Sequence, residues 1–198
     1  YVPRRNALRY SGVTHILFLL GMWIGLLWIG FFLLLMSDPG SVVEEGTGSA
    51  ASALTKMYVS GYTLSTLGVG DYVPCSEGCQ IIMAAFSFAG FIFITTAMTY
   101  LMSLTTAVIH KRNLSLFIAN MGDSPEELAA SFYDGEHFSI LTDISARLRE
   151  MINKHNQNHY AHPAVHYFYS TARDESLSIN LVNVDEALTI LTHHVESK

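Results

Sequence analysis

Residues 65–72 have the types and the spacing best suited to bind a cation. They read Ser-Thr-Leu-Gly-Val-Gly-Asp-Tyr and lie between two long apolar runs. A cation that gives up its water shell needs replacement oxygens, which stacked rings of backbone carbonyls can supply. Carbonyls that point the same way require ordinary and left-handed backbone in alternation, and Gly68 and Gly70 adopt the left-handed form at no steric cost. The segment is therefore predicted to offer its peptide oxygens to a dehydrated cation.

The stretch before this segment also favours a cation. Residues 50–65 are moderately apolar and too short to cross a bilayer, which suits a re-entrant helix that enters from outside and stops midway. The partially negative C-terminal end of such a helix would point toward the cation. Thr66 can add a hydroxyl at the inner mouth. One chain cannot close a ring of carbonyls, so a fourfold assembly is implied.

The composition and the apolar runs indicate a membrane protein. Of the 198 residues, 50% are hydrophobic and only 14% are charged, against about 25% charged in an average soluble domain. Residues 15–36 and 81–109 are each long enough to cross the roughly 30 Å hydrocarbon core. The first run is too long for a signal-peptide core and is expected to be retained. The chain begins at Tyr1 rather than Met, which leaves open whether a native N-terminus is missing.

Basic residues flank the two runs and predict the orientation. These residues are Arg4, Arg5, Arg9, Lys111 and Arg112. Between the runs, acidic residues outnumber the single basic residue, Lys56. The N- and C-termini are therefore predicted to be cytoplasmic, in a multi-pass protein of the cell membrane. No run carries regularly spaced Arg residues, so no voltage-sensing helix is expected.

The expected fold is an all-α membrane protein with a small helical cytoplasmic domain. Residues 1–14 would form a cytoplasmic N-terminal segment, 15–112 the transmembrane pore domain and 113–198 the cytoplasmic domain. Residues 41–49 are rich in Gly, Ser and Glu and would form an outer loop with little to pack. Cys75 and Cys79 lie on the outer side, where a disulfide is permitted. Because so short a loop often strains a disulfide, free thiols remain the alternative.

The stretch from residue 58 to residue 71 resembles the pore signature of tetrameric potassium channels. It reads Tyr-Val-Ser-Gly-Tyr-Thr-Leu-Ser-Thr-Leu-Gly-Val-Gly-Asp, and the layout of span, pore loop and span is similar to that of their two-helix bacterial members. The resemblance covers roughly residues 10–112. It implies a homotetramer in a lipid bilayer that conducts K+ passively, with no enzymatic activity, no organic cofactor and no nucleic-acid partner.

The resemblance also assigns roles to residues 66–70, which we refer to as the filter segment. Thr66, Leu67, Gly68 and Val69 would supply the oxygens that coordinate K+, and Gly70 would shape the outer mouth. The expected fold thus contains two transmembrane helices, a re-entrant pore helix and a selectivity-filter loop.

Three departures from the family pattern concern support of the filter segment. Val69 stands where the family most often has Tyr or Phe, and residues 58–59 stand where many members have two Trp residues. Tyr62 occupies the position where some members carry a Glu bonded to the residue equivalent to Asp71. Our hypothesis is that the Tyr62 hydroxyl or a water supports Asp71 instead. Weaker support leaves a weakly selective monovalent cation channel as the alternative function.

The second run carries the residues expected to open and line a pore. Gly90 falls where the family has a hinge glycine, and Met98, Thr99, Met102 and Thr106 fall on the face expected to line the cavity and its inner constriction. The alternatives are that Gly90 only permits close helix contact and that the Met residues only pack between helices. The hydroxyls could also bond carbonyls of their own helix.

The residues after 112 are predicted to form a helical bundle or a short coiled coil. Residues 124–127 read Ser-Pro-Glu-Glu, a strong helix start, and Asp134 and Gly135 would end that helix. Apolar residues recur at helical spacing over residues 141–151 and 177–191, although residues 177–182 also alternate like a strand. The absence of a Gly-x-Gly-x-x-Gly motif here argues against a nucleotide-binding sensor.

Four histidines gather around Pro163 in this part of the chain. They are His155, His159, His162 and His166. They could bind a divalent metal or respond to protons between pH 5 and 8, or they could be solvated or capping residues. A membrane-anchored metal or pH sensor with a vestigial pore is therefore a further alternative function. The sequence does not identify the regulatory ligand of residues 113–198.

Overall fold

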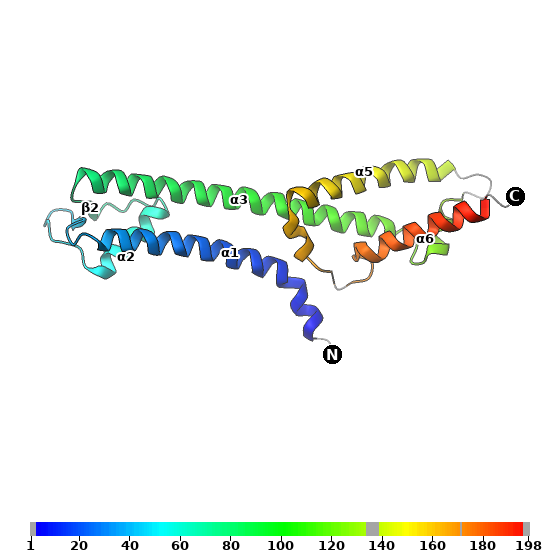
Figure 1. Ribbon diagram of the computed structural model, residues 1–198, viewed down its shortest axis with the longest axis horizontal. Coiled ribbons are helices and arrows are strands. Elements are labelled where there is room, and N and C mark those ends of the chain that lie inside the picture. The colour runs from blue at the N-terminus through cyan, green and yellow to red at the C-terminus, as the bar shows by residue number, and fades with distance from the viewer. Residues whose placement is uncertain (1–2, 134–138, 171, 196–198) are drawn as a thin grey trace. The chain divides into compact units, whose positions relative to one another are not determined.

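The computed structural model describes residues 3–133, 139–170 and 172–195, which divide into two compact units (Figure 1). The span unit comprises residues 16–101. The tail unit comprises the described residues from 102 onward together with the start of the first helix, up to residue 15. In chain order the elements are α1 (Pro3–Met36), β1 (Val42–Glu44), α2 (Ala53–Leu64), β2 (Tyr72–Pro74), α3 (Glu77–Ala119), α4 (Pro125–Ser131), α5 (Ser139–Ala161), the 3-10 helix η1 (Pro163–Tyr167) and α6 (Leu177–Val195).

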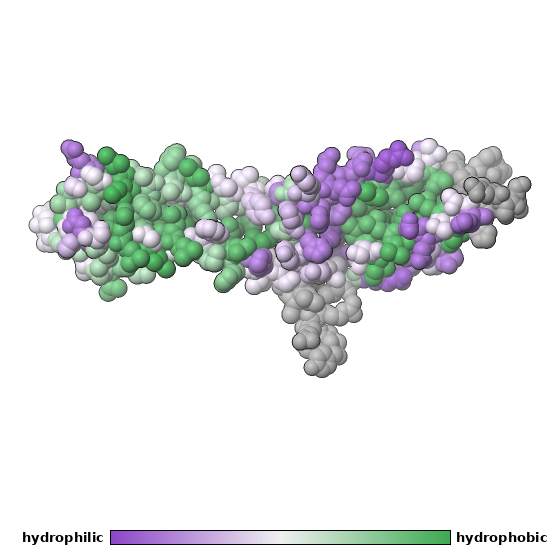
Figure 2. Space-filling view, in the orientation of Figure 1, coloured by the Kyte–Doolittle hydropathy of each residue, from purple (hydrophilic) through white to green (hydrophobic). Residues whose placement is uncertain are grey.

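Two of the helices are long and apolar enough to cross a membrane, over Ser11–Met36 in α1 and Glu77–Ala119 in α3. Only 11% of the apolar window in the first and 6% of that in the second is buried within the chain. The core helix of a soluble protein would be mostly buried. Figure 2 shows hydrophobic side chains over the surface of the span unit, which suits contact with lipid or with other apolar surfaces.

The short helix α2 packs against both long helices through the core of the span unit. Its start is capped by Ser52, whose hydroxyl accepts a hydrogen bond from the Thr55 amide at 3.2 Å. The buried members of the core are Phe31, Leu35, Val42, Val59, Tyr62 and Leu64. Phe31 of α1 stacks on Phe86 of α3 with ring centroids 4.2 Å apart. The predicted re-entrant helix is thus present, and it begins three residues after the predicted start and ends one residue before the predicted end.

A two-stranded antiparallel ribbon adds to the otherwise helical fold. β1 pairs with β2 so that Val42 lies opposite Pro74 and Glu44 lies opposite Tyr72. Ser41 and Val42 are buried, so the expectation that residues 41–49 have little to pack is wrong for the start of this stretch, whereas residues 44–49 are exposed. The ribbon was not predicted because its short strands gain their order from pairing with each other and from the buried Val42. Cys75 and Cys79 are free thiols.

The tail unit is built as the helical spacing predicts. Its buried core joins α3, α4, α5 and α6 through Leu114, Ile118, Leu128, Ala129, Phe132, Leu148, Leu177, Val184 and Ala187. Ser124 caps α4 and accepts a hydrogen bond from the Glu127 amide at 3.3 Å. Residues 177–182 are helical, not a strand. The predicted helix end at Asp134 and Gly135 lies outside the described residues.

The predicted domain boundary after residue 112 falls inside a continuous helix. α3 runs unbroken from the span unit into the tail unit. Likewise, the predicted N-terminal segment 1–14 is, from Pro3 onward, part of α1. Both long helices therefore exceed the length that one membrane crossing requires.

Candidate functional site

The filter segment begins where α2 ends. The amide of Thr66 donates to Thr63 O and the amide of Leu67 donates to Tyr62 O, each at 3.0 Å. These bonds use carbonyls of the last helical turn, which otherwise lack intrahelical partners. The chain is thereby held to the end of α2 as it enters the filter segment.

Beyond this turn the backbone alternates in handedness. The φ angle is +59° at Thr66, +59° at Gly68 and +86° at Gly70, whereas Leu67 and Val69 are not in the left-handed region. The alternation that the two glycines predict is therefore present, and it extends to Thr66. A β-branched residue in left-handed backbone is strained by about 1–3 kcal/mol. Such strain persists only where the surrounding structure enforces it.

The strand that leaves the filter segment is fixed by backbone and side-chain bonds. The Tyr62 hydroxyl of α2 donates to Tyr72 O at 3.1 Å. The sequence predicts Asp71 as the supported residue, so the observed acceptor lies one residue further along the chain. Asp71 O instead accepts from the Glu45 amide at 2.9 Å, beside the β1–β2 ribbon. The two ends of the filter segment are thus tied to α2 and to the ribbon.

An unpredicted brace joins α2 to α1. The Trp28 indole N–H of α1 lies 3.0 Å from Ser60 Oγ and 3.1 Å from Met57 O. The indole ring also lies against Gly61, where an added Cβ would come within 3.3 Å of Trp28 Nε1. The signal in the sequence for this contact was a Trp in the middle of an apolar run, since an indole N–H away from water needs a hydrogen-bond acceptor.

Gly90 permits a close approach of α3 to the end of α2. A Cβ at this position would lie 2.0 Å from Leu64 O and 2.8 Å from Leu64 C. Only a residue without a side chain fits at position 90. The contacted residue, Leu64, lies two residues before the filter segment. The close-contact role that the sequence left open is therefore present. The hinge role stays a prediction, since α3 continues through Gly90 without a break.

Three threonine hydroxyls of α3, at Thr95, Thr99 and Thr106, bond carbonyls of their own helix. Thr95 Oγ1 donates to Phe91 O at 2.8 Å, and Thr99 Oγ1 donates to Thr95 O at 2.9 Å. Thr106 Oγ1 donates in the same way to a carbonyl one turn earlier, at 3.0 Å. Met98 is 64% exposed and Met102 is 68% exposed. The Met98 and Met102 side chains are therefore available to line a cavity or to contact another chain.

Three of the four tail histidines form a loose chain of rings. His155 and His159 lie on α5 with ring centroids 6.2 Å apart, and His159 and His166 are also 6.2 Å apart. His162 precedes η1. Within the described part of the chain, no group of three or more His, Cys, Asp or Glu residues is placed to share a metal ion.

His155 is the histidine of this group with the most unusual surroundings. Its Nδ1 is buried and has no hydrogen-bond partner among the described residues. Burial lowers the pKa of His155 below its ordinary value, and Lys111, His159 and His110 lower it further. The folded tail unit therefore holds this imidazole in its neutral form more strongly than the unfolded chain does.

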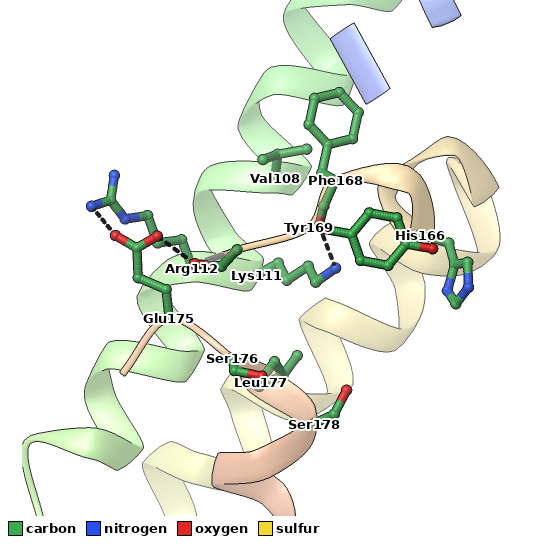
Figure 3. Close-up of a pocket in the computed structure, with 11 residues that line it drawn as sticks. Val108, Lys111, Arg112, His166, Phe168, Tyr169, Glu175, Ser176, Leu177 and Ser178 are labelled. Carbon is green, nitrogen blue, oxygen red and sulfur yellow. Dashed lines mark hydrogen bonds and ion pairs between the residues drawn. The ribbon is translucent and has the colours of Figure 1, made fainter. Parts of the chain in front are cut away.

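A cavity of about 310 Å³ in the tail unit lies beside residues 108–112 of α3 and the start of α6. Lys111 Nζ donates to Val165 O at 3.3 Å and to Phe168 O at 3.1 Å. Arg112 forms an ion pair with Glu175. Figure 3 shows the bond from Lys111 to Phe168 and the Arg112–Glu175 pair as dashed lines. Both basic side chains thus bind α3 to the segment before α6.

The same segment contacts the start of α1 within the tail unit. A Cβ at Gly12 would lie 2.9 Å from Tyr167 O and 2.9 Å from the Phe168 ring. The His15 and Tyr167 rings are 5.6 Å apart. The segment around Tyr167 and Phe168 therefore touches α1 and is bound by Lys111 of α3.

Comparison with known proteins agrees with this geometry. Residues 18–107 match the ion channel family. The matching part of the chain contains α2, the filter segment and most of both spans. The uncharacterized membrane protein YdjJ of Bacillus subtilis (strain 168) is 30% identical over 190 residues, which are 96% of this chain and 56% of that protein. The chain thus spans little more than half the length of this relative. No solved structure matches the chain significantly.

Substitution of Gly90 by Ala tests the close contact between α3 and α2. We expect a loss of stability of about 1–3 kcal/mol, because the new methyl group has no room beside Leu64 O. Gly25→Ala is the matched control, since nothing lies within 4 Å of a Cβ there. Thermal unfolding of the purified protein in detergent measures both. A Gly90→Ala variant as stable as the wild type would show that the contact is not required.

Acidification tests the environment of His155. Burial lowers the pKa of His155 in the folded state. Its contribution to the free energy of unfolding is therefore fully present above its pKa in the unfolded chain, about 6.5. That contribution is lost as the pH falls through the pKa of the folded state. The unfolding temperature of the tail unit should therefore drop between pH 7.5 and pH 5, and His155→Gln should reduce that drop. His193→Gln, an exposed histidine of α6, is the control. An equal drop in the wild type and in His155→Gln would contradict the assignment.

Proposed function

We propose that the chain is a subunit of a homotetrameric potassium channel in the cell membrane. The proposal is carried by the alternating handedness at Thr66, Gly68 and Gly70, in a segment between two helices of membrane-spanning length. Alternation of this kind points successive carbonyls the same way, as replacement of the hydration shell of an ion requires. The carbonyls of residues 66–69 would coordinate K+, and Gly70 would shape the outer mouth. Four copies are needed to surround the ion.

The inner helix would supply the rest of the permeation path. Met98 and Met102 are exposed in the single chain and, with Thr99 and Thr106, would line the cavity and the gate. Bending at Gly90 would move the part of α3 that follows. Ions would pass down their gradient, so the activity needs neither a chemical reaction nor an organic cofactor.

The tail unit is proposed to be a cytoplasmic regulatory or assembly domain. It is bound to α3 through Lys111 and Arg112 and touches the start of α1 at Gly12. A change in the segment around Phe168 would therefore reach both membrane helices. This arrangement is also what the orientation predicted from the basic flanks requires, with both termini in the cytoplasm.

A weakly selective cation channel is the second candidate. Val69 has no hydroxyl to anchor the middle of the filter segment, and its side chain is 39% exposed. A filter segment held only at its ends would distinguish K+ from Na+ less strictly. The two candidates differ in one measurable quantity, the permeability ratio of K+ to Na+.

Ion flux through the purified chain in liposomes tests the proposal. We expect K+ flux that Ba²⁺ blocks, and a reversal potential near that of K+ when Na+ is on the opposite side. Gly68→Ala should reduce the flux at least tenfold, because an L side chain is strained at φ +59°. Gly48→Ala, at φ +67° in the outer loop and with open space around it, should leave the flux unchanged.

Each outcome of this assay separates the candidate functions. A reversal potential near zero under these bi-ionic conditions would favour the weakly selective channel. Wild-type protein that passes no ion would contradict both channel functions and favour a sensor with a vestigial pore.

A further inference from the structure

Lys56 is buried although it carries the single positive charge between the two spans. The residue is 2% exposed and lies in the first turns of α2. Its Nζ donates to Leu35 O at 2.9 Å, to Asp38 O at 2.6 Å and to Pro39 O at 3.0 Å. An ammonium group has three N–H donors. Every donor of Lys56 therefore has a backbone carbonyl as its acceptor.

The three acceptors belong to the end of α1 and the turn that follows it. The last carbonyls of a helix have no intrahelical partners and carry the negative end of the helix dipole. Lys56 thus occupies the place where a bound cation would otherwise satisfy these oxygens. Because the charge is covalently attached to α2, it fixes the start of α2 to the end of α1.

We propose that Lys56 is a positioning residue for the filter segment. The inference rests on the proposed channel function and adds a residue that determines selectivity. α2 is a short rigid helix, so the position of its first turn sets the position of its last turn, where Thr66 and Leu67 are hydrogen-bonded. Lys56 therefore acts on the inner end of the filter segment through α2.

A second path leads from the same carbonyl cluster to the outer end of the filter segment. Leu35 O, which accepts from Lys56, also accepts from Ser41 Oγ at 2.6 Å. Ser41 O in turn accepts from the Cys75 amide at 3.1 Å, directly after β2. Leu35 O of α1 is thus connected by hydrogen bonds both to α2, which precedes the filter segment, and to the end of β2, which follows it.

The charge of Lys56 has a geometric role that packing alone would not provide. Burial of a charge is unfavourable unless it is fully paired, and an apolar side chain of similar volume would fill the space at lower cost. A methionine, however, leaves three carbonyls without a donor and permits α2 to slide along α1. The filter segment has no anchoring hydroxyl at Val69, so its geometry depends on the position of its ends.

Two measurements on Lys56→Met in the full-length chain test the proposal. The first is the K+ to Na+ permeability ratio in liposomes, which we expect to fall by roughly tenfold or more, since a displacement of about 1 Å in a preorganised site has effects of this order. The second is amide hydrogen exchange in detergent, which should accelerate over residues 61–72 and not in the tail unit. The exchange measurement does not require a conducting channel.

Control measurements separate positioning from surface charge and from loss of fold. The permeability ratio should change equally at low and high ionic strength, because a surface-potential effect would be screened by salt. Lys56→Arg keeps the charge but cannot place one nitrogen among three carbonyls, so its ratio should lie between those of the wild type and Lys56→Met. Leu54→Ala, at an 81% exposed position of the same turn, should behave as the wild type.

The outcomes distinguish this inference from the channel function itself. A wild-type chain without ion flux overturns the proposed function, and the exchange measurement then decides the role of Lys56. A selective wild type with unchanged ratio and exchange in Lys56→Met overturns only the role of Lys56. If Lys56→Met does not assemble, Lys56→Arg decides, and wild-type values in that variant overturn the inference.

Discussion

The filter segment alternates in backbone handedness from Thr66 to Gly70, and a backbone of this kind needs support from the structure around it. Thr66 adopts left-handed φ despite its branched Cβ, which is the local sign of this constraint. The strand is held from its two ends, by the last turn of α2 on one side and by the β1–β2 ribbon on the other. The single hydroxyl that reaches across, Tyr62, bonds the residue after Asp71.

Most of the contacts that hold α2 in place come from α1. Trp28 bonds the middle of α2, Lys56 of α2 bonds the carbonyls at the end of α1, and Phe31 stacks on Phe86 of α3. On the inner side, Gly90 lets α3 approach the end of α2. These contacts hold α2 at its start, its middle and its end, in a chain whose residues 58, 59 and 69 depart from the potassium channel signature. Within the tail unit, Lys111 of α3 donates a hydrogen bond to Phe168 O, which joins α3 to the segment before α6.

The features that the sequence predicts are those encoded locally. Two apolar runs, a short helix and a Gly-x-Gly segment are each visible within about 30 residues, and all are present. The bonds of Trp28 and Lys56 join residues 17 to 32 positions apart, so no local pattern reveals their partners. A signal was available, since a single cation in an apolar helix and an indole N–H in a lipid-facing span both demand acceptors. The ribbon was missed because three-residue strands carry too little periodicity to be recognised.

The position of ions in the assembled protein tests the account most directly. The structure of the protein in a bilayer mimetic, determined with Tl+ in place of K+, would locate the permeant ion by anomalous scattering. The account predicts a fourfold axis with ion density between the carbonyls of residues 66–69 of four copies. An assembly without a fourfold axis, or carbonyls of the filter segment that point into packed protein with no ion between them, would contradict it.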